Sequence, residues 1–214
     1  MSVIAVDTPH GEARAHLHSA DRPAAAIILG HGAGGGVEAP DLVAATEVAV
    51  SEGVSVALVE QPYRVAGRRS PAPARQLEAV WRAAAEELRA DEFRSTPLIV
   101  GGRSLGARVA CRTAVEMDAV AVLCLAFPLQ PPRRKGGKQS PSRIDELDGV
   151  GLPTLVVQGE HDQFGIPPAG PNRTVITVPG NHGLRADPAA VGDAVRSWLP
   201  GIVRELEPQG AVGD

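Results

Sequence analysis

The sequence is poor in aromatic residues and in cysteine. Aromatic side chains make up 3% of the 214 residues, and the two cysteines are Cys111 and Cys124. A scarcity of aromatic groups argues against a deep tunnel for a lipid chain, because ligand tunnels are lined mainly by apolar and aromatic side chains. Two cysteines within apolar stretches fit buried, reduced thiols better than a disulfide framework. We therefore expect a cytoplasmic protein.

The sequence also lacks a strong charge of one sign and a long apolar run. The net charge is −4 and the charged fraction is 21%, which argues against a general binder of nucleic acid. The first 21 residues have no basic start followed by an apolar core. The longest unbroken apolar run, Ala119 to Phe127, is too short to span a membrane. The sequence thus predicts no nucleic-acid and no membrane partner, and it makes no prediction of oligomeric state.

What the chain contains is an alternation of apolar runs with longer amphipathic stretches, which is typical of parallel β-α-β units. The length fits one domain, expected over residues 1–205, with a flexible tail at 206–214. Strands are predicted at Ala13–His18, Ala24–Gly30, Val54–Glu60, Leu98–Gly102, Ala119–Phe127, Thr154–Gly159 and Thr174–Pro179. Helices are predicted at Pro40–Ser51, Pro73–Ala90, Leu105–Met117 and Pro188–Glu205. The predicted fold class is α/β, with a doubly wound, mostly parallel sheet.

A G-x-S-x-G motif spans Gly102 to Gly106, directly after a predicted strand and before a predicted helix. A serine on such a turn takes a sparsely allowed backbone conformation, so the residues two positions away must lack side chains. Ser104 is therefore a candidate nucleophile. The Leu105 N–H at the start of the helix can face a developing oxyanion. The alternative is a helix-capping serine flanked by glycines.

A nucleophilic serine needs a base, and the base needs an orienting acid. Asp162 follows the strand predicted at Thr154–Gly159, and His182 lies in a glycine-flanked loop before the last helix. We predict Asp162 as the acid and His182 as the base. Glu160 is the nearest competing acid, and the alternatives are a solvated turn residue and a surface histidine.

A glycine-rich loop, Leu29 to Gly36, admits two interpretations. Its G-x-G-x-x-G spacing at Gly30, Gly32 and Gly35, with Glu60 at the end of the next strand, is also seen in dinucleotide-binding units. That interpretation is weakened because several residues and Pro40 separate the loop from the next helix. In a hydrolase, the same loop presents the Ala33 N–H as a second oxyanion donor. We expect no cofactor and no metal.

Six stretches together resemble the α/β-hydrolase family that groups small bacterial hydrolases with the testis-expressed proteins and the third regulatory subunit of the non-specific-lethal complex, and more distantly the dienelactone hydrolases. These stretches are GHGAGGG, QPYRVAGRR, GGRSLGARVA, FPLQPP, VVQGEHDQFG and GNH. The resemblance covers about Ala24 to Leu199 and implies an α/β-hydrolase fold with Ser104, Asp162 and His182 as the triad. The chain departs from the family at its start, where one or two strands precede Ala24 and a shortened sheet is expected.

The predicted function is a serine hydrolase that cleaves a small carboxylic ester, thioester or lactone through an acyl-enzyme. About 26 residues separate Phe127 from Thr154, too few for a cap of several helices, so we expect an open site without a substantial cap domain. Some members of the family serve as components of complexes. A non-catalytic interaction protein with the same fold is therefore the alternative.

Basic side chains follow two of the predicted strands at the edge where the triad is expected. These are Arg64, Arg68, Arg69, Arg133, Arg134, Lys135 and Lys138. They are either solvated loop charges or a rim that attracts an anionic substrate, such as a carboxylate-bearing ester. On the second interpretation Arg64 and Arg68, together with Phe164 next to the predicted acid, bind the substrate.

Overall fold

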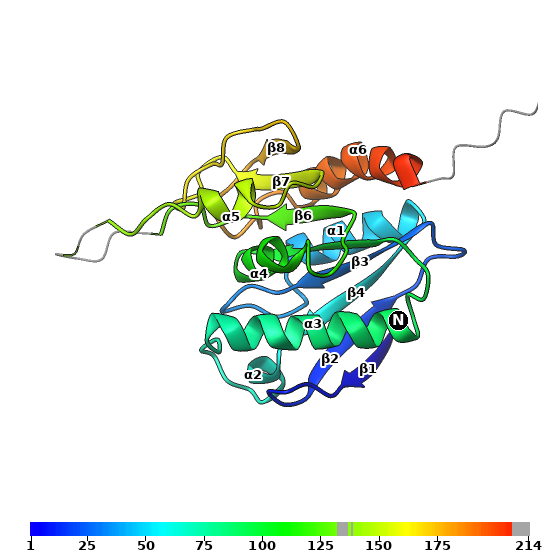
Figure 1. Ribbon diagram of the computed structural model, residues 1–214. Helices are drawn as coiled ribbons and strands as arrows, with labels where there is room; N and C mark the ends of the chain where they lie inside the picture. The colour runs from blue at the N-terminus through cyan, green and yellow to red at the C-terminus, as the bar shows by residue number, and fades with distance from the viewer. Residues whose placement is uncertain (132–136, 138, 207–214) are drawn as a thin grey trace, which may run out of the picture.

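An eight-stranded sheet forms the centre of the computed structural model, which describes residues 1–131, 137 and 139–206 (Figure 1). The strands follow the order β1-β2-β4-β3-β5-β6-β7-β8, and β2 pairs antiparallel with both β1 and β4 while the other neighbours are parallel. The strands are β1 Ser2–Val6, β2 Ala13–His18, β3 Ala25–Gly30, β4 Val54–Glu60, β5 Leu98–Arg103, β6 Ala121–Leu125, β7 Thr154–Gly159 and β8 Arg173–Val178. The helices are α1 Pro40–Ser51, α2 Pro62–Val65, α3 Ala74–Ala90, α4 Leu105–Thr113, α5 Ile144–Asp148 and α6 Pro188–Leu206.

Helices cover both faces of the sheet, with α3 and α4 on the face toward the viewer in Figure 1 and α1 and α6 on the far face. Each face has its own apolar core. Trp81 of α3 and Phe127 after β6 are buried on the first face, and Leu42 of α1 and Leu199 of α6 are buried on the second. The predicted α/β class with a doubly wound, mostly parallel sheet is confirmed.

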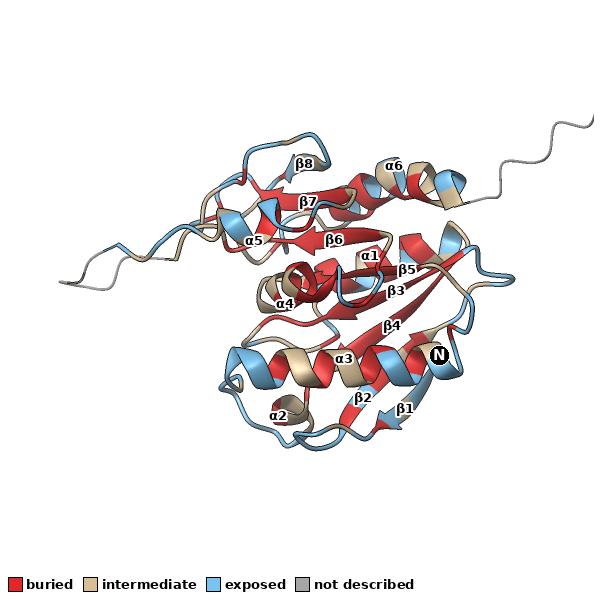
Figure 2. Cartoon of the chain, in the orientation of Figure 1, coloured by how far each residue is buried: buried red, intermediate tan, exposed pale blue. Residues whose placement is uncertain are grey.

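The central strands are continuous apolar runs because both of their faces are covered. Every residue of β3 and of β7 is buried, whereas the edge strand β1 is largely exposed (Figure 2). This difference explains why the sequence indicates the central strands clearly. A half-exposed strand of five residues gives a much weaker pattern.

Several sequence expectations need correction. The strand β1 was not predicted, and it forms a hairpin with β2. With two strands before Ala25 the sheet has eight in all, so the expected shortening at its start was wrong. The short helices α2 and α5 were also not predicted, and α4 ends at Thr113 instead of Met117. Helices of one turn carry too few residues to show a period.

The two cysteines are free and buried, as predicted, and their Sγ atoms lie 3.5 Å apart. The contact with Cys111, together with burial, raises the pKa of the Cys124 thiol. Between β6 and β7, α5 is the helix present in the described part of the chain, consistent with the expected lack of a substantial cap. Within the described residues, no helix is both long and apolar enough to cross a membrane. The predicted tail lies, from residue 207 on, outside the described residues.

Helix α4 approaches β3 so closely that two glycines face each other. A Cβ on Gly106 would lie 3.0 Å from the Cα of Gly30 and would collide with the carbonyl group of that residue. A Cβ on Gly102 would meet the same carbonyl oxygen. The G-x-S-x-G spacing therefore allows the helix that follows Ser104 to pack directly on the central strand.

We expect the substitution Gly106→Ala to lower the free energy of unfolding by about 1–3 kcal/mol or more, the usual effect of overpacking, because the Gly30 backbone cannot move aside. Gly201→Ala is the matched control, since a Cβ there has no atom within 4 Å. In a helix that change is expected to be neutral or to stabilise by up to about 1 kcal/mol. Urea unfolding of both variants measures the difference, and equal effects would contradict the prediction.

Candidate active site

Four loops meet at the carboxyl edge of the parallel strands. Ser104 directly follows β5, Asp162 follows β7, and His182 follows β8, while the glycine-rich loop follows β3. Parallel neighbours end at the same edge of a sheet, which is where open α/β sheets hold their ligands. The topology thus gathers the residues that the sequence suggested separately.

Ser104 occupies a left-handed backbone conformation between β5 and α4. Its φ is 52° and its ψ is −103°, a conformation that costs a non-glycine residue about 1–3 kcal/mol. The Ser104 N–H donates to the carbonyl of Leu125 at 2.8 Å. The serine is the N-cap residue of α4 but its side chain makes no capping hydrogen bond. Its hydroxyl is therefore free to face the other loops, which argues against the helix-cap interpretation.

A chain of two hydrogen bonds joins the serine to the acid. His182 Nε2 lies 2.8 Å from Ser104 Oγ, and His182 Nδ1 lies 2.8 Å from Asp162 Oδ2. A carboxylate only accepts hydrogen bonds, so Nδ1 carries the proton and Nε2 is left to accept from the serine hydroxyl. This is the tautomer that a general base for Ser104 requires.

The Asp162 carboxylate is fully buried and surrounded by donors. Besides the imidazole, the Phe164 N–H donates to its Oδ1 at 2.8 Å and the Gln158 amide to its Oδ2 at 2.7 Å. Glu160, the competing acid, is exposed, and its own N–H donates to the Val178 carbonyl. The geometry therefore brings Asp162, and not Glu160, to the histidine.

Gln158 is a residue of this site that the sequence analysis missed. Its Nε2 lies within 3.1 Å of three acceptors: the Asp162 carboxylate and the carbonyls of Phe127 and Gly165. With the amide reversed, its oxygen would face all three acceptors, so only this orientation is favourable. The available signal was a polar residue inside the apolar run TLVVQG.

Two side chains, His31 and Tyr63, fix the glycine-rich loop through hydrogen bonds. Tyr63 Oη donates to the Ala33 carbonyl at 3.1 Å. His31 Nδ1 donates to the Gly32 carbonyl at 2.8 Å, and its Nε2 accepts from the Gln61 N–H at 3.1 Å. The bond to Nε2 needs a neutral imidazole, and burial lowers the pKa of His31 accordingly.

The loop also lies beside the serine. A Cβ on Gly32 would be 3.7 Å from Ser104 Cβ, so Ala33 follows a residue that adjoins the nucleophile. Leu105 is the first residue of α4, and its N–H has no acceptor within the helix. Two observations bear on the dinucleotide-binding interpretation of the loop. Helix α1 begins only at Pro40, away from the glycines. The carboxylate of Glu60, the candidate ribose ligand, has its Oε2 3.6 Å from His16 Nε2. The loop therefore lacks the helix N-terminus on which a pyrophosphate would rest.

The predicted substrate residues have different surroundings. The Phe164 ring packs on the His182 imidazole, with centroids 4.3 Å apart. Arg64 is half-buried, and a Cβ on Gly36 would be 4.0 Å from its Nη2, so it adjoins the glycine-rich loop. Arg68 is exposed. Arg133, Arg134, Lys135 and Lys138 lie outside the described residues, so the structure does not address that half of the basic rim.

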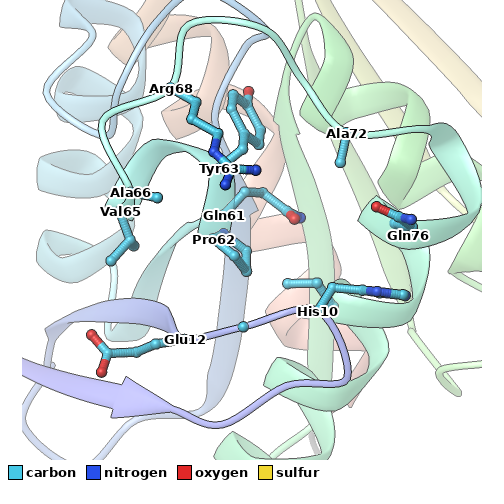
Figure 3. Close-up of a pocket in the computed structure, with 12 residues that line it drawn as sticks. His10, Glu12, Gln61, Pro62, Tyr63, Val65, Ala66, Arg68, Ala72 and Gln76 are labelled. Carbon is cyan, nitrogen blue, oxygen red and sulfur yellow. The ribbon is translucent and has the colours of Figure 1, made fainter.

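Arg68 lines a cavity of about 350 Å³ between the β1–β2 turn, α2 and the start of α3 (Figure 3). The cavity is also lined by His10, Gln61, Tyr63 and Gln76. Tyr63 is thus both a wall of this cavity and the brace of the Ala33 carbonyl. Over the described residues, no group of three or more His, Cys, Asp or Glu side chains could hold a metal ion.

Comparisons with known proteins bear on the fold. A family model described as an alpha/beta hydrolase domain matches residues 23–170. No curated protein matches the chain in sequence.

Among solved structures, Est1E from Butyrivibrio proteoclasticus has a TM-score of 0.75 at 17% identity, covering 95% of this chain and 100% of its own. XC6422 from Xanthomonas campestris, described as a serine hydrolase without a lid, has a TM-score of 0.71 at 20% identity over 93% and 95% of the two chains. A dienelactone hydrolase from Anabaena variabilis has a TM-score of 0.70 at 16% identity over 94% and 96%. The expected α/β-hydrolase fold is confirmed.

We expect Gln158→Leu to slow the reaction of Ser104 with a fluorophosphonate probe roughly tenfold to a hundredfold. The substitution removes a charge-assisted hydrogen bond from the carboxylate that orients His182, and such a bond is worth about 1.5–3 kcal/mol. Gln139→Leu is the matched control, because that exposed amide donates to the Pro131 carbonyl. The rates are measured by intact-mass analysis of the labelled protein. Equal rates in the two variants would contradict a role of Gln158 in supporting the acid.

Proposed function

Because the chain belongs to the alpha/beta hydrolase domain family, we propose that it is a serine hydrolase that cleaves a small carboxylic ester, thioester or lactone through an acyl-enzyme. The observation that carries the proposal is the line of two 2.8 Å hydrogen bonds from Ser104 through His182 to the buried Asp162. A serine held in a left-handed conformation and bonded to an oriented imidazole has the parts that nucleophilic catalysis needs.

In the proposed reaction, Ser104 Oγ attacks the carbonyl carbon of the substrate while His182 Nε2 takes the hydroxyl proton. The tetrahedral intermediate collapses when the bond to the leaving group breaks, and the imidazolium returns its proton to the leaving alcohol or thiol. A water molecule, activated by the same imidazole, then attacks the acyl-serine and releases the carboxylic acid. Asp162 stabilises the imidazolium at each stage without itself taking the proton.

The Leu105 and Ala33 N–H groups are the proposed donors to the negative oxygen of the intermediate. Leu105 heads helix α4, whose dipole adds to the stabilisation of that charge. Tyr63 fixes the carbonyl of Ala33, and this supports a defined orientation for the peptide groups of the loop. Preorganised donors of this kind need no rearrangement when the charge develops.

The proposed substrate is small because, in the described part of the chain, the one-turn helix α5 is the helix between β6 and β7, and this leaves no substantial cap to enclose a large group. Support comes from proteins of the same fold: one is described as a serine hydrolase without a lid, another as a dienelactone hydrolase, and Est1E has been solved with ferulic acid bound. The narrower resemblance to the small bacterial hydrolases of the testis-expressed group, and the cytoplasmic location, stay predictions.

The test of the function is a set of triad variants. We expect Ser104→Ala and His182→Ala each to lower kcat on p-nitrophenyl acetate by about 10⁴-fold or more, and the double variant to be scarcely worse, because the members act as a unit. Asp162→Asn should cost about 10⁴-fold, since it favours the wrong imidazole tautomer. A fluorophosphonate should modify Ser104 in the wild type and leave the Ser104→Ala variant unmodified.

Glu160→Gln is the control, as it changes an exposed acid in the same loop and should leave kcat unchanged. Additive losses in the Ser104 and His182 double variant would exclude the triad mechanism. A wild-type protein that neither turns over esters nor reacts with the probe would instead favour the non-catalytic interaction protein.

We further propose that Arg64 and Arg68 favour substrates that carry a carboxylate. Neither side chain has an ion-pair partner within 4.0 Å in the part of the chain that the structure describes. Both follow β4 at the edge that carries the triad. Unpaired cations at the rim of a site raise the local concentration of an anion, an effect that salt screens.

Accordingly, an Arg64→Ala, Arg68→Ala variant should lose roughly twofold to tenfold in kcat/KM for a carboxylate-bearing ester and keep its value for a neutral analogue. In the wild type, raising the ionic strength should affect only the anionic substrate. Arg22→Ala is the control, since Arg22 is exposed before β3, at the opposite edge of the sheet. If salt and the substitutions affect the two substrates equally, both arginines are solvated loop charges with no role in substrate binding.

A further inference from the structure

Arg103 is the last residue of β5 and directly precedes Ser104. Its side chain turns back beneath the neighbouring loops, where three of its nitrogen atoms meet three different segments. Nε lies 3.0 Å from Asp41 Oδ2, and Nη2 donates to the His182 carbonyl at 3.1 Å. Nη1 lies under the glycine-rich loop, 2.7 Å from where a Cβ on Gly32 would be. One guanidinium, on the residue before the nucleophile, thus contacts the start of α1, the segment that carries the base and the loop that carries an oxyanion donor.

The partner of this guanidinium is a carboxylate with no exposed surface. The Asp41 side chain is 0% exposed and that of Arg103 14%. Asp41 lies in the first turn of α1, at the end of the segment that begins with the glycine-rich loop. Burial raises the pKa of Asp41, and the positive charge of Arg103 opposes that effect. A charge pair buried this deeply is weak evidence for a contribution to stability, because desolvation offsets much of the attraction.

We propose that Arg103 is a positioning residue that, anchored by Asp41, holds the His182 loop and the glycine-rich loop in register with Ser104. This inference rests on the proposed function. Three loops from distant parts of the chain must place their groups to within a fraction of an ångström, and small misplacements are costly to a reaction between bound groups. A guanidinium carries its donors in fixed directions on three nitrogen atoms and can reach three separate segments, whereas the donors of an ammonium group are all on one atom.

The geometry also explains a glycine of the loop. A Cβ on Gly32 would lie 2.7 Å from Nη1 and would require the guanidinium to shift, whereas a Cβ on Gly34, two residues further, would meet nothing within 4 Å. The loop thus rests on the guanidinium at one defined position. Removing the guanidinium takes away that support as well as the bond to the His182 carbonyl.

The decisive experiment separates stability from positioning with a pair of variants. Arg103→Met leaves Asp41 as an unpaired buried charge, so it should lower the urea midpoint by about 1 M or more and kcat on p-nitrophenyl acetate roughly tenfold to a hundredfold, with KM within about twofold. The double variant Arg103→Met, Asp41→Leu removes both charges. It should recover most of the urea midpoint, because apolar groups often replace a buried pair without loss, while kcat stays low.

Two further variants complete the set. Arg103→Lys keeps a charge for Asp41 but cannot also hold His182, so it should unfold near the wild-type midpoint with a lowered kcat; it serves if Arg103→Met does not fold. Arg112→Met is the control, because Arg112 is comparably buried and pairs with Glu78 and Glu146 on the α3 and α5 side of α4. It should lower the midpoint and leave kcat unchanged.

A double variant whose kcat recovers together with its stability would overturn the positioning role, as would an unchanged kcat in Arg103→Met or in Arg103→Lys. The wild type is labelled with a fluorophosphonate in the same series. A wild type that is labelled at Ser104 while the Arg103 variants react equally fast counts against the inference alone. A wild type that is not labelled overturns the proposed function and the inference with it.

Discussion

The contact between β3 and α4 is the constraint on which the site depends. Gly30 and Gly106 face each other there with no room for a Cβ, and this contact fixes where the helix after Ser104 begins. The serine between them has a φ of 52°, which a non-glycine residue keeps only when its surroundings over-determine it. The bond from the Ser104 N–H to the Leu125 carbonyl supplies part of that restraint. Close packing of helix on strand is thus what stores the strain and presents the hydroxyl.

Two buried carboxylates, Asp162 and Asp41, show how the surroundings give different roles to side chains of one type. Asp162 accepts from an imidazole, an amide and a backbone N–H, so its charge is well solvated by fixed donors. Asp41 faces a guanidinium, and its burial raises its pKa. The first carboxylate orients a group that changes charge during the proposed reaction. Asp41 pairs with the Arg103 guanidinium, which keeps its charge throughout the reaction and can therefore hold the loops in place at every stage.

The sequence predicted well the features that depend on neighbours along the chain. The boundaries of β4, β7 and α1 match the expected ones, because their apolar runs and starting prolines are local signals. The placing of Ser104, Asp162 and His182 at strand ends likewise follows from the order of the elements.

What the sequence did not predict depends on contacts between distant segments. Arg103 in β5 and Asp41 in α1 form an ion pair, although they lie 62 positions apart in the sequence. In the sequence, Gln158 only interrupts an apolar run. In the folded protein, its amide donates to the carbonyl of Phe127 and to the carboxylate of Asp162. Tyr63 lies in a one-turn helix that has no period to detect. No local pattern marks such residues, because their partners are known only once the sheet is assembled.

The few tyrosine and phenylalanine side chains of the protein each have a structural role. The single tyrosine of the chain, Tyr63, braces the Ala33 carbonyl, and of the three phenylalanines, Phe93 and Phe127 are buried in the core. Phe164 packs on the imidazole of His182 instead. The Phe164 ring therefore supports the base. Because this ring is engaged with the base, it is not free to cover a long apolar chain, and this agrees with the small ester proposed here.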